Sequence, residues 1–558
     1  MTAAPSEVIV EFDVPARMRD GVTLRANVYR AQASGPQPVL LARTPYGKDV
    51  PLVLEWLDPV QTARRGFVVV IQDTRGRFAS EGEWEPFRFE RQDGYDTVEW
   101  AANLPGSNGC VGMYGFSYWG NSQWLAAIER PPSLVAIAPG MTWSEPMDGL
   151  FGRGGAVELG VAVPWSLEHG IDYLARHEGG ADDIARHVDA VIDEHDSVSE
   201  QGYWDIPVRE MAVLRRHGLS NVGLMRAVGD PGFIDSCRVT GSYDQVEIPS
   251  FHIAGWHDIF LQGTLDNYEA MVRLGREARL IVGPWTHASY ADPIGQQLYG
   301  MRASKTGVAV HAHGDVNDLQ LAWLRRHLVP DATIVLPEAP VRIFVMGRNA
   351  WRDEASWPPP NAVSERWFLH TGGGLERTPS GAGSSHSEFA YDPMDPVPTV
   401  GGHTVMSPGY PAGPIDQRRV EARDDVLVFT SELLEADLEV TGRLRAVLHA
   451  ESSAPSTDWV VRLCDVHPDG RSFALCDGIL RVDDGAEGSR CYEIDLWSTS
   501  NVFLRGHRLR VHVTSSSFPR WDRNLNTGNQ RDGHHEVARQ RVFHDADRPS
   551  YVELPAVR

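Results

Sequence analysis

The stretch that decides the fold reads Val111-Gly112-Met113-Tyr114-Gly115-Phe116-Ser117-Tyr118-Trp119-Gly120 and continues into a helix-like Gln123-Trp124-Leu125-Ala126-Ala127-Ile128. An apolar strand enters a tight turn in which a serine lies between glycines, and a helix follows. This is the pattern of a nucleophile elbow, in which glycines permit a turn too tight for a bulky Cβ. The free N–H groups at the start of the helix point towards developing negative charge. The pattern predicts Ser117 as a nucleophile.

The second glycine comes one residue later than in the usual G-x-S-x-G spacing. A structural serine in a glycine-rich turn therefore remains an alternative on this motif alone.

The sequence around the elbow alternates short apolar runs with helical stretches, as in a parallel sheet covered on both faces. Similar runs return after residue 250. With the elbow, this order predicts an α/β-hydrolase core. The apolar runs are 39–42, 67–71, 134–138, 250–254, 280–282 and 341–345.

Two further units are predicted. Between 145 and 245 the chain turns helical and charged, and Ile184, Val188, Val191 and Ile192 share one helix face, which favours an inserted helical cap. The core then comprises 1–144 and 246–356. From 357 to 558 short strands alternate in polarity, as at 444–448 and 509–513, which predicts an antiparallel β-sandwich of jelly-roll type.

A serine hydroxyl is a weak nucleophile until a base takes its proton, and the base in turn needs an orienting carboxylate. In α/β-hydrolases the acid and then the histidine follow the serine, each after a later strand. Asp258 directly follows the 250–254 run and His287 directly follows the 280–282 run. His257 is a competing base, but neighbouring side chains on an extended segment point to opposite sides, so it should not pair with Asp258.

The oxyanion that forms during acyl transfer needs two hydrogen-bond donors. The backbone N–H of Tyr118, the residue after the nucleophile, is predicted to be one. The loop Arg43-Thr44-Pro45-Tyr46-Gly47-Lys48 follows an early strand and offers the phenol of Tyr46 as the second, although a tyrosine packed in a turn is an equal alternative from these residues alone.

Net charge, cysteine content and the N-terminal segment indicate which partners and which cellular location to expect. The net charge of −23 argues against nucleic acid, because binding to phosphates needs a basic face. Five scattered cysteines without a C-x-x-C pair do not indicate zinc or redox chemistry. The N-terminus resembles neither a signal peptide nor a membrane anchor, so a cytoplasmic location is expected. A homo-oligomer is possible.

Taken together, the motifs resemble the CocE/NonD hydrolases of the bacterial cocaine esterase type, which are related to X-Pro dipeptidyl peptidases and α-amino acid ester hydrolases. The resemblance covers essentially the whole chain. The matching segments are RTPYGK (43–48), QDTRGRFASEGEW (72–84), VGMYGFSYWG (111–120), GWHDIF (255–260), GPWTH (283–287), DVHPDG (465–470) and SNVFLRGHRLRVHVTSSSFPRWDRN (500–524).

The resemblance implies a triad of Ser117, Asp258 and His287, with the Tyr118 amide and the Tyr46 hydroxyl as oxyanion donors. Asp73 and Arg75 look structural. It also implies a substrate pocket between the three units, at positions corresponding to Phe151, Trp165, Phe260 and Met406. Phe151 and the Val405-Met406 pair depart from the cocaine esterase pattern, as do His257 and Ile259, which does not favour cocaine as the substrate.

The predicted function is therefore a serine carboxylesterase that hydrolyses small aryl or alkyl esters without a metal or organic cofactor. The main alternative is the same machinery acting on amides or amino-acyl groups, as in an X-Pro dipeptidyl peptidase, a β-lactam acylase or an α-amino acid ester hydrolase. A metal-dependent hydrolase has support only from His311, His313 and Asp315. A non-catalytic binding protein is a further alternative, since jelly rolls often serve recognition.

Overall fold

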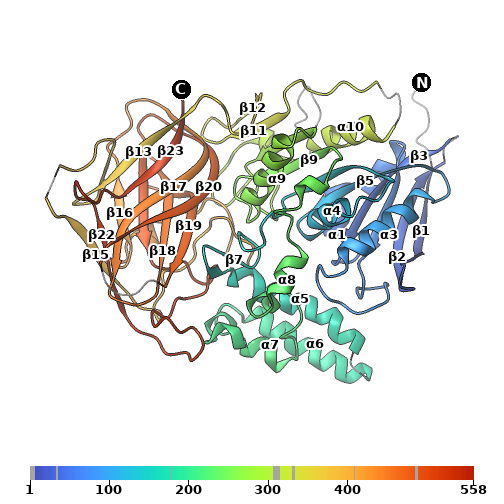
Figure 1. Ribbon diagram of the computed structural model, residues 1–558, viewed down its shortest axis with the longest axis horizontal. Helices are drawn as coiled ribbons and strands as arrows, with labels where there is room; N and C mark the ends of the chain where they lie inside the picture. Colours follow the sequence, from blue (N-terminus) through green and yellow to red (C-terminus); the bar gives the residue numbers. More distant parts are fainter. Residues whose placement is uncertain are drawn as a thin grey trace.

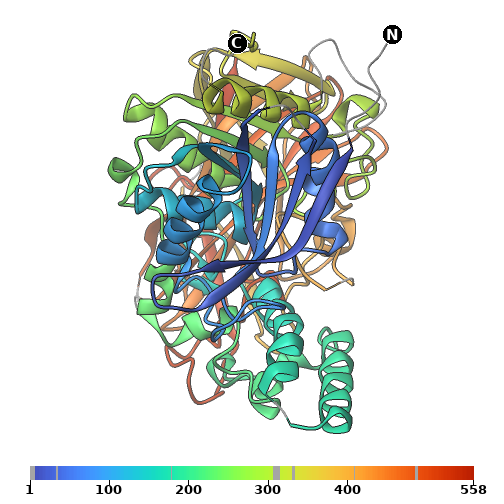
Figure 2. The ribbon, with the colours of Figure 1, turned by 90° about the vertical axis from the view of Figure 1, so that its right-hand side faces the viewer.

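The computed structural model describes residues 7–32, 35–177, 179–305, 315–329, 333–381, 383–407, 409–483 and 488–558. Two large sheets lie side by side, one at each end of the molecule, and a group of helices extends below them in the view of Figure 1. Figure 2 shows the first sheet from its outer side, with α5 and α6 projecting away from it. Ser117, Asp258 and His287, the residues predicted to be catalytic, all follow strands of the first sheet.

The first sheet has ten strands in the order β1-β2-β4-β3-β5-β6-β9-β10-β11-β12. From β4 to β11 along this order, neighbouring strands pair in parallel, whereas β1, β2 and β12 pair antiparallel at the edges. The strands are β1 Val8–Arg17, β2 Thr23–Ala31, β3 Gln37–Thr44, β4 Val68–Asp73, β5 Ser107–Phe116, β6 Leu134–Gly140, β9 Ser250–Gly255, β10 Ala278–Gly283, β11 Val341–Val345 and β12 Ala350–Glu354.

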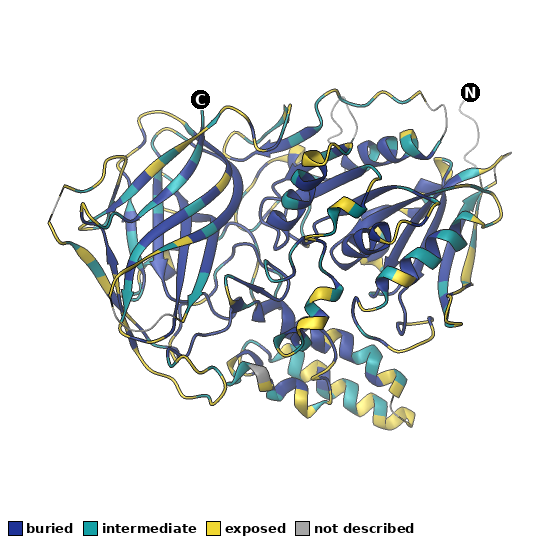
Figure 3. Ribbon diagram, viewed as in Figure 1, coloured by how far each residue is buried: buried dark blue, intermediate teal, exposed yellow. Residues whose placement is uncertain are grey.

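All six apolar runs predicted as strands are confirmed, because each lies in or overlaps one of these strands. They are almost completely buried, as continuous apolar strands of a covered parallel sheet should be (Figure 3). The covering helices are α1 Pro51–Trp56, α2 Pro59–Arg64, α3 Glu90–Ala102, α4 Tyr118–Ile128, α9 Leu261–Arg273 and α10 Val316–Leu328. The predicted α/β core is therefore confirmed.

The chain between β6 and β9 leaves the sheet, although these two strands are paired neighbours. It forms a small hairpin and then helices. These elements are β7 Gly152–Arg153, β8 Ala156–Val157, α5 Leu159–His177, α6 Ala181–Asp196, α7 Ala212–Arg216 and α8 Pro231–Ser236, with short 3-10 turns between them. On α6, Val191 is buried but Ile192 is 41% exposed, so the predicted apolar face of this helix is only partly buried. Ile192 lies one position, or about 100°, beyond Val191 on the helix, and α6 packs mainly on α5.

The C-terminal part is β-rich and has its own apolar core. Leu444, Ala446 and Leu448, like Leu509, Val511 and Val513, are buried, as the alternation read from the sequence predicts, but Val447 and His512 between them are buried as well. Its sheet order is β15-β22-β17-β23-β13-β14-β16-β21-β18-β19, with β20 paired to β17. The strands are β13 Ala362–His370, β14 Gly374–Glu376, β15 His386–Tyr391, β16 Leu427–Thr430, β17 Leu438–Ser452, β18 Thr457–Val466, β19 Ser472–Val482, β20 Arg490–Phe503, β21 Arg508–Thr514, β22 Ala538–Phe543 and β23 Tyr551–Val557, with α11 at Arg418–Glu421.

The five cysteines are free: Cys237, Cys464 and Cys476 are buried, Cys110 is partly buried and Cys491 is exposed. Within the described part of the chain, no helix combines the length and apolar character needed to cross a membrane.

Candidate active site

Ser117 lies at the turn between β5 and α4, in a backbone conformation with φ 59° and ψ −130°. Its N–H donates to the carbonyl oxygens of Gly140 and Met141, both at 3.1 Å. Gly115 has φ 130°, and a Cβ there would lie 2.8 Å from the Trp119 ring. A Cβ on Gly120 would lie 2.7 Å from the Gly140 carbonyl oxygen. The displaced second glycine of the motif therefore serves the packing of α4 on β6.

Asp258 and His287 follow β9 and β10, which are parallel neighbours, so both side chains emerge at the same edge of the sheet. The His287 Nδ1 and the Asp258 Oδ2 are 2.6 Å apart. The other carboxylate oxygen of Asp258 accepts the Phe260 N–H at 2.6 Å. Asp258 is fully buried and His287 is 9% exposed. This arrangement fixes the carboxylate and leaves Nε2 of His287 free to exchange a proton.

His257 does not join this pair. Its Nε2 lies 3.2 Å from the Tyr299 hydroxyl, and the side chain is fully buried. Burial lowers the pKa of His257 to about 3, so the ring is neutral. The geometry agrees with the expectation that the residue beside Asp258 points elsewhere.

Tyr46 lines the same cavity as Ser117. The Trp165 indole N–H donates to the Tyr46 hydroxyl at 3.4 Å. Burial raises the pKa of Tyr46, against smaller opposing effects of hydrogen bonds with Trp165 and Ser117, so the phenol keeps its proton. A neutral phenol beside Ser117 can donate one hydrogen bond to an oxyanion.

Tyr118 begins α4, and its backbone N–H is among the first-turn groups that lack an acceptor within the helix. Its side chain is anchored in the core, where the hydroxyl donates to Glu90 Oε1 at 3.0 Å and accepts the Phe87 N–H at 2.9 Å. Glu90 also accepts a charged hydrogen bond from Arg43 at 2.5 Å. This buried network holds the first residue of α4 in place.

A cavity of about 200 Å³ opens above Ser117 and His287. Two predicted pocket residues, Trp165 and Phe260, line it. The other two, Phe151 and Met406, do not belong to its described lining, although they pack in the same apolar cluster as Trp165 and Phe260. The remaining lining residues are Tyr46, Leu52, Phe87, Phe116, Tyr118, Trp143, Leu150, Val161, Glu168, Leu224, Ala288 and Val405.

Met406 lies against Gly160 of α5, where a Cβ would lie 2.8 Å from the methionine sulfur, and its neighbour Val405 faces the cavity instead. Glu168 is the one carboxylate among the described lining residues, and sequence reasoning missed it. It lies three residues after Trp165 on α5, and residues at this spacing lie on the same face of a helix. The predicted pocket position of Trp165 could therefore have indicated Glu168.

Asp73 and Arg75 make contacts that support a structural role. Asp73 pairs with Lys48 at 2.8 Å, and Arg75 donates two hydrogen bonds to Asp93, at 2.9 and 2.6 Å. These contacts fix the turn after β4 against the Tyr46 loop and α3.

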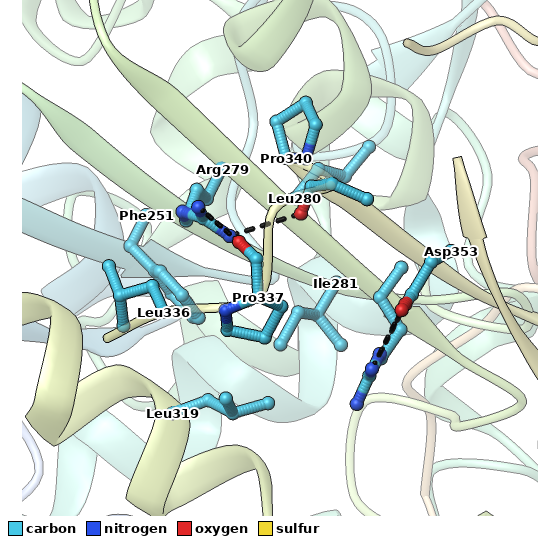
Figure 4. A pocket seen from close by; sticks show the side chains of 11 residues that line it. Phe251, Arg279, Leu280, Ile281, Leu319, Leu336, Pro337, Pro340 and Asp353 are labelled. Atoms are coloured by element: carbon cyan, nitrogen blue, oxygen red, sulfur yellow. Dashed lines mark hydrogen bonds and ion pairs between the residues drawn. The ribbon is translucent and has the colours of Figure 1, made fainter. Parts of the chain in front are cut away.

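A second cavity, shown in Figure 4, has a volume of only about 20 Å³ and lies between β10, β11 and α10. Arg279 donates there to the carbonyl oxygens of Pro337 and Ala339, at 2.7 and 3.0 Å. Arg342 pairs with Asp353. Its polar groups are thus already engaged, and its lining contains no nucleophile beside a base.

Of the metal-binding motif considered above, the described part of the chain includes Asp315. His311 and His313 lie outside the described residues. Asp315 caps the start of α10, where its side chain accepts the Asp318 N–H at 2.8 Å.

Comparison with known proteins shows the family of the chain. Residues 20–289 match the X-Pro dipeptidyl-peptidase (S15) family, and residues 335–553 match the C-terminal non-catalytic domain of X-Pro dipeptidyl-peptidases. Cocaine esterase from Rhodococcus sp. (strain MB1 Bresler) is 36% identical, covering 98% of this chain and 99% of its own length.

Two solved structures share the fold over nearly the whole length. An α-amino acid ester hydrolase is 24% identical with a TM-score of 0.76 and covers 100% of this chain and 98% of its own. An aminopeptidase from a marine sediment Thaumarchaeota archaeon is 24% identical with a TM-score of 0.78 and covers 99% and 97%. The chain belongs to the CocE/NonD family of serine hydrolases, with an α/β-hydrolase domain followed by a β-rich C-terminal domain.

Proposed function

We propose that this serine hydrolase is a carboxylesterase that cleaves small aryl or alkyl esters through Ser117, His287 and Asp258. The observation that carries the proposal is the 2.6 Å bond between His287 and a fully buried Asp258 at the cavity that Ser117 also lines. The name of the cocaine esterase relative supports ester chemistry. The cavity is mainly apolar, which suits an uncharged acyl or aryl group.

The proposed mechanism has two half-reactions. His287 takes the proton of Ser117 as the serine oxygen attacks the ester carbonyl, and the Tyr118 N–H and Tyr46 hydroxyl stabilise the oxyanion. The tetrahedral intermediate collapses, and His287 protonates the leaving alcohol. Water, activated by the same imidazole, then attacks the acyl-enzyme and releases the acid. Asp258 keeps His287 in the tautomer that presents Nε2.

The finer domain architecture belongs to the same proposal. The segment 145–245 would act as a helical cap over the core of 1–144 and 246–356, and 357–558 would be a jelly roll. Support comes from the cavity lining, which combines residues of the core with Val161 and Trp165 of α5 and with Val405. Substrate would thus be enclosed where the three units meet.

Active-site labelling tests the mechanism. A fluorophosphonate should label the wild type with one equivalent, and Ser117→Ala should abolish both labelling and the hydrolysis of p-nitrophenyl acetate, butyrate and benzoate. Ser122→Ala is a matched control, because Ser122 lies on α4 but its hydroxyl donates to backbone carbonyls. Labelling that persists in Ser117→Ala would refute the assignment.

A second candidate is the hydrolysis of esters or amides that carry an α-amine, and Glu168 favours it. Its carboxylate lies at the cavity, is 56% exposed, and accepts a hydrogen bond from His195 at 3.1 Å. A single carboxylate at the mouth of an apolar cavity would attract a cationic substrate through an electrostatic interaction that solvent partly screens.

Glu168→Gln separates the two candidates. For a cationic aminoacyl ester such as phenylglycine methyl ester, kcat/KM should fall about fivefold to tenfold, mainly through KM, because the attraction is lost. For p-nitrophenyl butyrate it should stay within twofold. Equal kcat/KM of the variant and the wild type on the cationic ester would remove the second candidate's support.

A further inference from the structure

We propose that Asp465, His467 and His507 bind one divalent transition-metal ion, at a site separate from Ser117. One carboxylate oxygen and one imidazole nitrogen from each histidine lie within 4.8 Å of one another. The proposed ester hydrolysis does not need this ion. The inference therefore adds a binding site to the molecule and does not depend on the reaction.

The fold brings the three residues together from two neighbouring strands. Asp465 lies near the end of β18, opposite Leu509 on the antiparallel strand β21. His467 follows β18 directly, and His507 directly precedes β21. The side chains thus emerge at one end of a rigid strand pair, which suits a preorganised site.

The distances within the cluster are close to those of a metal site. His507 Nδ1 lies 2.8 Å from Asp465 Oδ1, and His467 Nε2 lies 3.9 Å from Asp465 Oδ2. The two imidazole rings are 4.5 Å apart between centroids. Ligand atoms of a tetrahedral zinc ion lie roughly 3.4 Å apart. Small side-chain rotations, mainly of the 25% exposed His467, would therefore bring the three atoms into coordination range.

The ligand chemistry selects the class of cation. Two neutral imidazoles and one carboxylate suit Zn²⁺, Co²⁺ or Ni²⁺, whereas Ca²⁺ and Mg²⁺ prefer oxygen ligands alone. Metal binding would replace the hydrogen bond between His507 Nδ1 and Asp465 Oδ1. Three protein ligands also leave at least one coordination position for water.

The cluster lines a cavity of about 270 Å³, which gives an ion a path to it. Two further polar atoms of the lining, Asn349 Oδ1 and Asn501 Nδ2, are buried and have no hydrogen-bond partner among the described residues. Buried polar atoms of this kind usually mark the position of a water or an ion. They could bond the waters that complete the coordination shell.

The cavity lies between the two domains, because Gln297, Tyr299 and Asn349 of the first domain line it together with the three ligands. Tyr299 also contacts His257, the neighbour of Asp258. An ion here would connect the β-rich domain to the loop that carries the Asp258 carboxylate. Since it would bind only the folded protein, it should raise thermal stability.

The test uses the full-length, tag-free protein after removal of metals with a chelator. In equilibrium dialysis against micromolar Zn²⁺, the wild type should bind one equivalent, and His467→Ala and His507→Ala should each weaken binding at least tenfold. Co²⁺ should give visible d–d absorption in the wild type and lose it in His467→Ala. His386→Ala is the matched control, because His386 likewise lies 3.9 Å from a carboxylate, that of Glu388, but belongs to no such cluster in the described chain.

His467 lies in a partly exposed turn, so His467→Ala should fold normally, and its unfolding midpoint without metal checks this. The proposal would be overturned if the wild type bound less than a tenth of an equivalent of each of the three ions, Zn²⁺, Co²⁺ and Ni²⁺. Equal affinity of His467→Ala and the wild type would also overturn it. Neither readout uses ester hydrolysis, so failure here is distinct from failure of the esterase mechanism.

Discussion

Ser117 holds a backbone conformation that residues other than glycine rarely adopt. Such a conformation costs on the order of 1–3 kcal/mol and persists only where the surroundings enforce it. Here the two hydrogen bonds from its N–H to Gly140 and Met141 and the start of α4 enforce it. The result is a serine that remains at the cavity although it is only 8% exposed.

Among single residues, Tyr46 gives a direct test: Tyr46→Phe should lower kcat for p-nitrophenyl butyrate about a hundredfold or more, with little change in KM. The phenol would donate to the oxyanion only in the transition state, and loss of one such donor costs roughly 3 kcal/mol. Steady-state kinetics would measure kcat and KM of Tyr46→Phe. The control is Tyr173→Phe, because Tyr173 lies on α5 outside the cavity lining. Unchanged kcat in Tyr46→Phe would exclude its hydroxyl from the mechanism.

Asp258→Asn should leave the cavity intact but lower kcat about 10⁴-fold, because the amide cannot enforce the His287 tautomer as the carboxylate does. Fluorophosphonate labelling should slow in parallel. A loss of less than tenfold would show that the 2.6 Å contact with His287 contributes little to catalysis.

At the scale of elements, α4 packs closely on β6, and the proposed activity should depend on this contact. A Cβ at position 120 would lie 2.7 Å from the Gly140 carbonyl oxygen and 3.0 Å from Thr142. Gly120→Ala should therefore lower the free energy of unfolding by about 1–3 kcal/mol and reduce activity per folded molecule, since α4 carries the Tyr118 N–H.

The control for this prediction is Gly229→Ala, where an added Cβ meets no atom within 4 Å. It should change stability by less than about 0.5 kcal/mol. Urea unfolding of both variants would give their free energies of unfolding, and activity would be measured before urea is added. Equal effects of the two substitutions would mean that α4 can move away from β6 without cost.

At the scale of the whole molecule, Glu158 joins the start of α5 to the β-rich domain. Its carboxylate accepts the Trp521 indole N–H at 2.7 Å and lies 3.6 Å from Arg520. Burial raises the pKa of Glu158 to about 7, against the opposing effect of Arg520. The folded protein therefore retains a proton on Glu158 at a pH where the unfolded chain, with a pKa near 4.5, has lost it.

The sign of the pH dependence follows from that difference. Between pH 4.5 and 7 unfolding releases a proton, so the stability contributed by Glu158 is fully present below pH 4.5 and is lost as pH rises through 7. Over this range the wild type should lose up to about 3 kcal/mol relative to Glu158→Gln, which keeps the acceptor for Trp521 without titrating. Thermal unfolding at several pH values would measure this. Parallel stability curves would contradict the raised pKa.

The sequence predicted best the features that depend on residues close together in the chain. The apolar runs indicated the strands because buried strands need continuous apolar side chains. Chain order and strand ends indicated Asp258 and His287, and parallel pairing of β9 and β10 then brings them within 2.6 Å. The glycines of the elbow indicated the turn at Ser117, because few other residues fit such a backbone.

The sequence by itself thus determined the α/β-hydrolase core and the β-rich C-terminal part and indicated the candidate residues at the strand ends, since local sterics and apolar periodicity depend on consecutive residues. Only the tertiary structure decided that Val405 and not Met406 lines the cavity, that Glu168 lies at its mouth, and that Glu90 anchors Tyr118. It also brought Asp465, His467 and His507 together beside the first domain. These contacts join segments far apart in the chain, and their geometry depends on how whole elements pack, which no local pattern specifies.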